Sequence, residues 1–238
     1  MINFGLVGYG KWGKILSKSI SLVGNLIFIS NTKKTYKIKK KIDWCLVATN
    51  DSSHYKITKY FLRKRIPVLC EKPLTRNLKL SREIIKISKQ YKTKLYINHV
   101  ELFKKKKLKI LKSNLIVRKK ISNDKIKDVL WKLCYHDLYL LYDYLKDKKL
   151  YINLIFLKEK QVKFSIFDGS KEYIFFYDYQ SKKKMHKINN INFITKINYL
   201  KNMIKAVINN RVNLKLNHKQ ALFCIKTILL IEKRVFKI

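Results

Sequence analysis

The first hundred residues alternate short apolar runs with amphipathic segments, and this alternation most constrains the fold. Apolar residues recur at helical spacing over residues 11–23, 54–64 and 77–91. The runs expected to form strands are Ile2–Val7, Asn25–Ser30, Asp43–Asn50, Ile66–Lys72 and Thr93–His99. Strands that alternate with helices at this spacing predict an α/β fold with a doubly wound parallel sheet.

After residue 100 the pattern changes, because extended runs follow one another. They are Tyr151–Leu157, Val162–Phe167, Tyr173–Tyr179 and Met185–Ile188, with a hairpin turn expected at Asp168–Glu172. Before them, a helix is expected at Lys104–Leu111 and a short strand at Leu115–Lys119. Helices are expected near residues 133–145, 194–209 and 218–235. This half predicts an α+β domain with a reduced, largely antiparallel mixed sheet of four strands. The expected organisation is one domain over residues 1–100 and a second over residues 101–238.

The first predicted turn, Gly8-Tyr9-Gly10-Lys11-Trp12-Gly13, lies between a strand and a helix. In this G-x-G-x-x-G pattern the first glycine permits a tight turn and the second lets a pyrophosphate approach the backbone. The third lets the helix pack close to the strand. The N–H groups that begin the helix attract phosphates. The turn therefore predicts a Rossmann dinucleotide site that includes Lys11, with Trp12 covering the phosphates or packing at the mouth.

The end of the second predicted strand indicates which dinucleotide is bound. A site for NAD normally has Asp or Glu about 20 residues after the glycines, where it bonds the ribose hydroxyls. Here the strand ends in Asn31-Thr32-Lys33, without a carboxylate. An uncharged tip followed by a cation favours NADP over NAD, and both remain open.

The tripeptide Glu71-Lys72-Pro73 follows a predicted buried strand. Open α/β sheets bind ligands beyond the carboxyl ends of their strands. A lysine beside a nicotinamide ring would be partly desolvated, and desolvation shifts the pKa of a lysine toward the range useful for proton transfer. Lys72 is therefore the candidate functional lysine.

Three segments of the first half, taken together, resemble the Gfo/Idh/MocA (glucose–fructose oxidoreductase / inositol dehydrogenase) family. They are GLVGYGKWG (5–13), CLVATNDSSHYKITKYFLRKRIPVLCEKPLT (45–75) and LYINH (95–99). In the second half, VLWKLCYHDLYLLYDYL (129–145) resembles the family's W-D-L-x-x-H-D helix, and residues 194–233 are similar to its closing helices. The resemblance implies a divergent and shortened member, with an NAD(P)-binding Rossmann domain before a domain for substrate and oligomer contacts.

The resemblance also implies an activity and residues that perform it. Hydride would pass between NAD(P) and a hydroxyl or keto carbon of a sugar, cyclitol or nucleotide sugar. Lys72 would bond the reacting oxygen, and His136 would be the general acid/base. His99, which ends a strand at the ligand edge, would contact substrate with them. The residues expected along the cofactor are Thr49, Asn50, His54, Glu71, Lys72 and Pro73.

The helix around His136 departs from the family pattern. The family commonly has Asp four residues before this histidine, where a carboxylate can orient the ring, and here the position is Lys132. A second hypothesis is therefore a catalytically degenerate member that still binds dinucleotide. Restoring Asp at position 132 would test it.

The net charge of +40 allows a third hypothesis, a protein that binds polyanions or nucleic acid. Only seven of the 55 basic residues are Arg, however, and the lysines are spread along the chain, so compositional drift explains the charge at least as well. We therefore expect a small-molecule partner, namely a sugar or nucleotide-sugar substrate, with no specific nucleic acid and no membrane. By analogy with relatives, a homodimer and a homotetramer are both possible assemblies.

The four cysteines (Cys45, Cys70, Cys134 and Cys224) are scattered without metal-ligand spacing. They are expected to be reduced, buried thiols in a cytoplasmic protein without a bound metal. No signal peptide or spanning apolar run is recognised.

Overall fold

The computed structural model describes residues 1–31, 41–195 and 197–237 as two compact units. Unit 1 contains Met1–Phe103 and Asn198–Ile225, and unit 2 contains Lys104–Ile197 and the chain from Lys226 onward. The sequence predicted two continuous segments, 1–100 and 101–238, whereas in the structure unit 1 also includes residues 198–225. Residues 198–225 join unit 1 because their apolar side chains complete its core.

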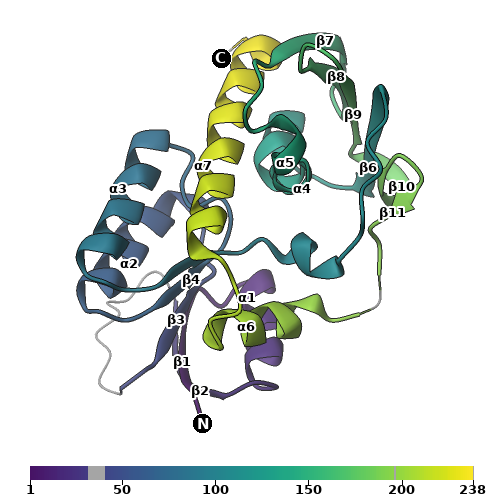
Figure 1. Cartoon of the computed structure of the whole chain (residues 1–238). Helices are drawn as coiled ribbons and strands as arrows, with labels where there is room; N and C mark the ends of the chain where they lie inside the picture. Colours follow the sequence, from purple (N-terminus) through teal and green to yellow (C-terminus); the bar gives the residue numbers. More distant parts are fainter. Residues whose placement is uncertain (32–40, 196, 238) are drawn as a thin grey trace. The chain divides into compact units, whose positions relative to one another are not determined.

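Unit 1 is built on a five-stranded parallel sheet with the strand order β2-β1-β3-β4-β5 (Figure 1). The strands are β1 (Asn3–Val7), β2 (Asn25–Ser30), β3 (Trp44–Val47), β4 (Val68–Cys70) and β5 (Leu95–Ile97). The helices are α1 (Lys11–Ile20), α2 (Asp51–Arg63), α3 (Leu78–Gln90), α6 (Tyr199–Ile208) and the first part of α7 (Leu214–Ile231), with a 3-10 turn η1 at Val100–Lys104. The predicted doubly wound parallel sheet is confirmed.

Both faces of this sheet are covered, because successive side chains of a strand point to opposite faces. Phe4 and Leu6 of β1 pack with side chains of α1 and α6 on one face. Val7 packs with side chains of α2 and α3 on the other face, together with Ala221 of α7. Strands buried on both faces read as continuous apolar runs, which is why the sequence shows them clearly.

Unit 2 contains a six-stranded mixed sheet with the order β11-β10-β6-β9-β8-β7. The strands are β6 (Ser113–Ile121), β7 (Tyr151–Leu157), β8 (Gln161–Phe167), β9 (Glu172–Asp178), β10 (Gln180–Ile188) and β11 (Ile191–Asn192). The helical segments are η2 (Ile126–Asp128), η3 (Leu130–Cys134), α4 (Tyr135–Leu140), α5 (Tyr142–Leu145) and η4 (Glu232–Phe236), with η3 and η4 in π-helical geometry.

The second sheet confirms the predicted mixed, mostly antiparallel architecture, because only the β6–β9 pair is parallel among its described pairs. It has six strands where four were expected. Strand β6, at the centre of the sheet, contains the short strand predicted at Leu115–Lys119, whereas the two-residue strand β11 was not predicted. The helix predicted at Lys104–Leu111 is wrong, because the 3-10 turn η1 ends at Lys104 and no helix follows it up to residue 111. The expected hairpin between β8 and β9 is present, and Gly169 adopts a φ of +91° in its turn.

Candidate functional site

The carboxyl ends of four parallel strands in unit 1 are aligned by their register. Val7 pairs with Val47, Val47 with Cys70, and Cys70 with Ile97. The residues that follow these strands therefore share one edge of the sheet, and they are Gly8, Ala48, Glu71 and Asn98. The strand order reverses between β1 and β3, so this edge includes the switch point where open α/β sheets bind ligands.

The glycine turn has one open position between two crowded ones. Gly8 has a φ of +98°, and a Cβ there would lie 2.6 Å from the backbone of Ala48. A Cβ on Gly13 would lie 2.1 Å from the Gly8 carbonyl oxygen. A Cβ on Gly10 would have no heavy atom within 4 Å. The packing of the protein therefore requires Gly8 and Gly13, whereas at Gly10 the missing side chain leaves open space over the backbone.

That open space lies at the start of helix α1. Gly10 is the N-cap residue, no side chain caps the helix, and its first turn contains no acidic residue. The first N–H groups of a helix lack intrahelical partners and attract anions. Space and positive polarity thus coincide at Gly10, and the turn fits the pyrophosphate of a dinucleotide.

Trp12 connects the glycine turn to Glu71. The Trp12 side chain is exposed and donates a hydrogen bond to the buried Glu71 carboxylate, which also accepts one from Asn98 Nδ2 at 2.5 Å. Burial raises the pKa of Glu71 above its ordinary value, while these two hydrogen bonds and the charge of Lys72 oppose the rise. Glu71 therefore holds three strand-end loops together, and Lys11 lies exposed on the first of them.

Lys72 is half-buried, and the Lys72–Pro73 peptide bond is cis. Its ammonium charge acts on both Glu71 and His99, so it lies within their electrostatic reach. His54 lies beneath this loop and is 1% exposed. Its Nδ1 is 2.7 Å from the Pro73 carbonyl oxygen, and its Nε2 is 3.0 Å from the Thr49 carbonyl oxygen. His54 therefore ties the loop after β3 to the loop after β4.

Three further residues of the expected cofactor site are at the ends of elements. The Thr49 hydroxyl accepts a hydrogen bond from Ser53 at 2.7 Å, and Asn50 is the exposed N-cap of α2. Asn31 is exposed directly after β2. The expected contacts of Thr32 and Lys33 lie outside the described residues.

His99 is enclosed rather than presented to solvent. Its ring is 0% exposed, and its Nδ1 lies 3.1 Å from Asn217 Nδ2 and 3.3 Å from Gln220 Oε1 of α7. The pKa of His99 is lowered to about 3, mainly by burial and to a smaller extent by the charges of His218 and Lys72, while the Gln220 hydrogen bond opposes the shift. The described contacts of His99 hold β5 against α7, and its substrate contact stays a prediction.

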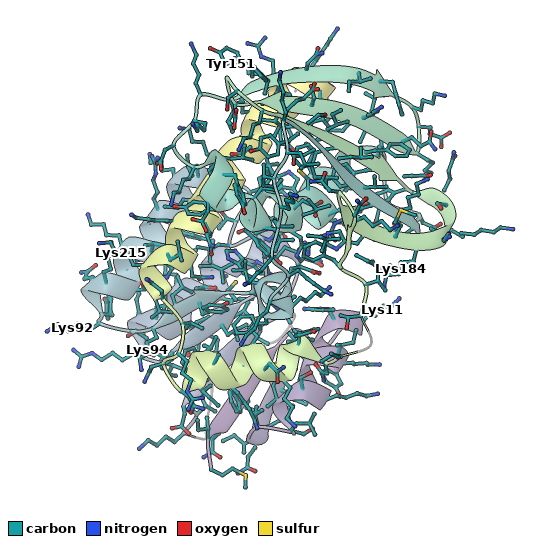
Figure 2. All side chains as sticks on the ribbon, turned by 45° about the vertical axis from the view of Figure 1, so that its right-hand side comes forward. Lys11, Lys92, Lys94, Tyr151, Lys184 and Lys215 are labelled. Atoms are coloured by element: carbon teal, nitrogen blue, oxygen red, sulfur yellow. The ribbon has the colours of Figure 1, made fainter. Side chains whose placement is uncertain are left out.

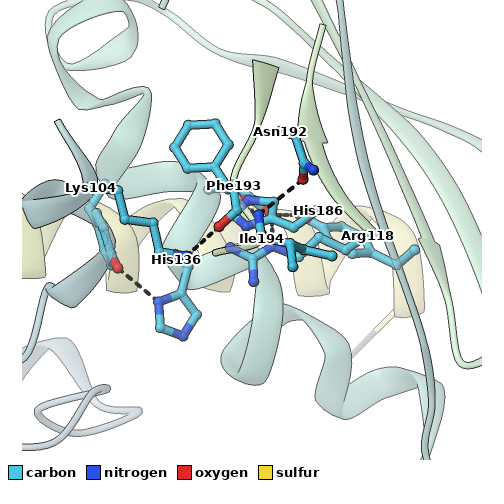
Figure 3. A network of polar contacts seen from close by, with 10 residues as sticks. Lys104, Arg118, His136, His186, Asn192, Phe193 and Ile194 are labelled. Carbon is cyan, nitrogen blue, oxygen red and sulfur yellow. Dashed lines mark hydrogen bonds and ion pairs between the residues drawn. The ribbon is translucent and has the colours of Figure 1, made fainter. Parts of the chain in front are cut away.

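In unit 2, His136, labelled in Figure 3, is half-buried on α4. It is paired with Tyr139 of the same helix. The His136 Nδ1 lies 2.8 Å from the Tyr139 hydroxyl oxygen, and the two rings meet edge to face with centroids 5.6 Å apart. Tyr139 is 1% exposed and makes a second edge contact with the ring of Tyr135. This pair could not be predicted from the sequence, because Tyr139 reads as one apolar residue of a nearly all-apolar helix.

The residue after His136 anchors the helix to the sheet. Asp137 is fully buried, and Arg118 Nε of β6 donates to both of its carboxylate oxygens at 3.0 and 3.1 Å. The Tyr177 hydroxyl of β9 donates to it at 2.8 Å, and His186 Nε2 of β10 lies 2.9 Å from it. Burial alone would raise the pKa of Asp137, but the Arg118 charge and the His186 and Tyr177 contacts hold it below its ordinary value. Figure 3 shows Arg118 and His186 in this network.

Lys132 pairs with an acidic residue of its own surroundings. Its Nζ lies 2.5 Å from Asp124 Oδ1, and both side chains are partly exposed. Lys132 belongs to the π-helical turn η3, whereas His136 belongs to α4. The rule that residues four apart share a face holds for an α-helix, so it does not carry across this junction.

The positive charge is distributed over many elements of both units. Figure 2 shows side chains that extend outward from separate parts of the chain, at Lys11, Lys92, Lys94, Lys184 and Lys215, and all five are exposed. In the part of the chain that the structure describes, no helix is long and apolar enough to cross a membrane. Across the same residues, no group of three or more His, Cys, Asp or Glu is arranged to hold a metal ion.

Comparison with known proteins gives a family-model match over part of the chain and a fold over nearly all of it. A family model described as an oxidoreductase family with an NAD-binding Rossmann fold (GFO_IDH_MocA) matches residues 18–99, beginning after the glycine turn. No curated protein matches the chain by sequence.

Solved structures match over nearly the whole chain. UDP-N-acetylglucosamine 3-dehydrogenase GnnA from Acidithiobacillus ferrooxidans is 12% identical with a TM-score of 0.83, over 98% of this chain and 97% of that one. Myo-inositol dehydrogenase from Corynebacterium glutamicum is 12% identical with a TM-score of 0.73, over 100% of this chain and 97% of that one. Residues 18–99 therefore match the Gfo/Idh/MocA oxidoreductase family model by sequence, and the chain shares the fold of these dehydrogenase structures over nearly its full length.

Proposed function

We propose that this protein is an NAD(P)-dependent oxidoreductase that transfers hydride between the nicotinamide and a hydroxyl or keto carbon of a sugar, cyclitol or nucleotide sugar. The family model supports the oxidoreductase class and an NAD-type cofactor. The named activities of two similar structures, a UDP-N-acetylglucosamine 3-dehydrogenase and a myo-inositol dehydrogenase, support the substrate class.

The observation that carries the proposal is the open backbone at Gly10. It is the one glycine of the turn whose side-chain position is open, and it lies where an uncapped helix begins at the switch point of the sheet. A pyrophosphate would occupy that space, and its oxygens would accept hydrogen bonds from the N–H groups at the start of the helix. Because Asn31, directly after β2, carries no negative charge, the proposal favours NADP over NAD.

Residues of this protein would bind the cofactor and transfer the proton of the reacting hydroxyl or keto group. Gly10, Lys11 and Trp12 would hold the phosphates, and the bound nicotinamide would supply or accept the hydride. Lys72 would donate a hydrogen bond to the reacting oxygen. His136 would exchange the proton of that oxygen as general acid or base.

A cofactor titration with a matched pair of variants tests this proposal. NADPH and NADH are titrated at moderate salt, which weakens non-specific attraction of phosphates to a highly cationic protein. Binding is followed by Trp fluorescence and by calorimetry. Trp12 is the exposed tryptophan beside the site, whereas Trp44 and Trp131 are buried.

In Gly10→Ala the new methyl group meets no protein atom, so the free energy of unfolding should stay within about 1 kcal/mol of wild type. Cofactor affinity should fall by about tenfold or more, because the methyl group occupies the proposed phosphate position. In Gly13→Ala the new Cβ meets the Gly8 carbonyl, so stability should fall by about 1–3 kcal/mol. Equal cofactor affinity in wild type and Gly10→Ala, or no saturable binding by wild type, would refute the proposed site.

A further inference from the structure

The Tyr139 hydroxyl is within hydrogen-bond distance of one of the two ring nitrogens of His136. It lies 2.8 Å from Nδ1, and the two residues are three apart on α4, so they share a helix face. Tyr139 is 1% exposed and also touches the ring of Tyr135, so its own ring is held by packing. The imidazole is thus hydrogen-bonded to a side chain that has little freedom to move.

Helix α4 is itself fixed to the sheet at the adjacent residue. Asp137 binds three strands at once, through Arg118 of β6, Tyr177 of β9 and His186 of β10. All of these groups are nearly or fully buried. The backbone that carries His136 therefore has a rigid support, and the ring orientation is decided by the contact at Nδ1.

A hydroxyl suits a histidine that changes its protonation state. When the ring is an imidazolium, both nitrogens donate, and the Tyr139 oxygen can accept from Nδ1–H. When the ring is neutral, the hydroxyl can donate to Nδ1 or accept from it. A lysine ammonium can only donate, and Lys132 is in any case paired with Asp124. Tyr139 can keep its hydrogen bond in every state that an acid–base cycle visits.

We propose that Tyr139 is the positioning residue of His136, so that Nδ1 is the held nitrogen and Nε2 is the nitrogen that exchanges the proton. The assignment of proton exchange to Nε2 rests on the proposed function, whereas the positioning of the ring by Tyr139 does not. The pair replaces the carboxylate that the family resemblance places at position 132.

The test compares Tyr139→Phe with Tyr135→Phe, which removes a hydroxyl from the neighbouring buried tyrosine of the same helix. Long-range proton–nitrogen spectra of protein labelled with 15N-histidine report the hydrogen bonding of each ring nitrogen without any substrate. Tyr139→Phe should change the Nδ1 signal of His136 and shift the tautomer ratio about two- to tenfold, as expected for one lost hydrogen bond. Tyr135→Phe should leave both signals close to wild type.

Turnover gives the second readout. With a substrate identified, Tyr139→Phe should lower kcat about two- to tenfold and change its pH profile, while the KM for the dinucleotide stays unchanged. An unchanged Nδ1 signal in Tyr139→Phe, or a response of Nε2 in its place, overturns the proposal. If Tyr139→Phe does not fold, the wild-type spectrum decides, because an Nδ1 shift typical of a solvent-exposed ring contradicts the pair. If wild type shows the held Nδ1 but no cofactor binding, the pair stands and the proposed function fails.

Discussion

The buried carboxylate of Asp137 allows a quantitative prediction for the variant Asp137→Asn. The substitution keeps the side-chain shape but removes the negative charge that faces Arg118. The guanidinium would lose a carboxylate that takes its Nε hydrogen bond on both oxygens, at 3.0 and 3.1 Å, and its side chain is only 9% exposed. Water cannot readily replace the lost partner at that depth.

Breaking a buried ion pair by removing one partner typically costs about 3–5 kcal/mol, because the other charge remains buried without compensation. For a chain of this size, each kcal/mol lowers Tm by about 2–4 °C. Asp137→Asn should therefore unfold about 6–20 °C below wild type, in the transition that belongs to unit 2.

The matched control is Asp124→Asn, which removes a carboxylate from the partly exposed pair with Lys132. A surface pair contributes about 0–1 kcal/mol, so this variant should unfold within a few degrees of wild type. Thermal unfolding followed by fluorescence and circular dichroism gives the Tm of both variants, urea titrations give their free energies of unfolding, and the buried Trp131 reports on unit 2.

The same comparison predicts a pH dependence. The pKa of Asp137 is lowered in the folded protein, so its contribution is present above the unfolded pKa, about 3.9, and is lost as the pH falls through the folded value. The difference between wild type and Asp137→Asn should therefore be constant near neutral pH and shrink below about pH 4. Equal stability of Asp137→Asn and Asp124→Asn at pH 7 would refute this account of the cluster.

Two further predictions concern unit 1. Lys72→Ala should reduce turnover by orders of magnitude while cofactor affinity stays nearly intact, and retained turnover would remove Lys72 from the proposed chemistry. The pKa of His99 in the folded protein is lowered to about 3. The wild-type free energy of unfolding should therefore decrease as the pH is lowered from about 6.5 to about 3, because over this range the proton binds His99 in the unfolded chain but not in the folded protein. His99→Asn should flatten that slope by up to about 1.4 kcal/mol per pH unit in equilibrium unfolding, and an unchanged slope would contradict the buried neutral ring.

The parallel sheet was readable from the sequence because four of its five strands, all except the edge strand β2, are buried on both faces. Runs such as Val68–Cys70 are apolar throughout and end at polar or glycine positions. Strand β6 was harder to recognise, since its burial alternates and it carries Arg118, Lys119 and Lys120. Only the ion pair with Asp137 explains how a cationic residue fits the inward face.

The site was readable only where backbone geometry demands particular residues. Gly8 and Gly13 follow from a tight turn and a close packing contact, so their spacing is visible in the sequence. The partner of His136 was not, because a tyrosine in an apolar helix gives no sign of where its hydroxyl points. The expected influence of Lys132 on His136 assumed α-helical spacing, and the π-helical turn changes that relation. The adjacent pair His136-Asp137 was the only feature of the sequence that indicated how Asp137 anchors helix α4 to the sheet.

The return of residues 198–225 to unit 1 has a consequence for synthesis on the ribosome. Leu200, Met203 and Ile204 of α6 fill the same core as Phe4 and Leu6 of β1. The nascent N-terminal sheet therefore exposes an apolar face until about a hundred more residues have been translated, at about 5–20 residues per second. During those seconds the family-matched segment is complete in sequence but unfinished as a folded body. A message truncated before α6 would release a chain with a cofactor turn and a bare, aggregation-prone sheet.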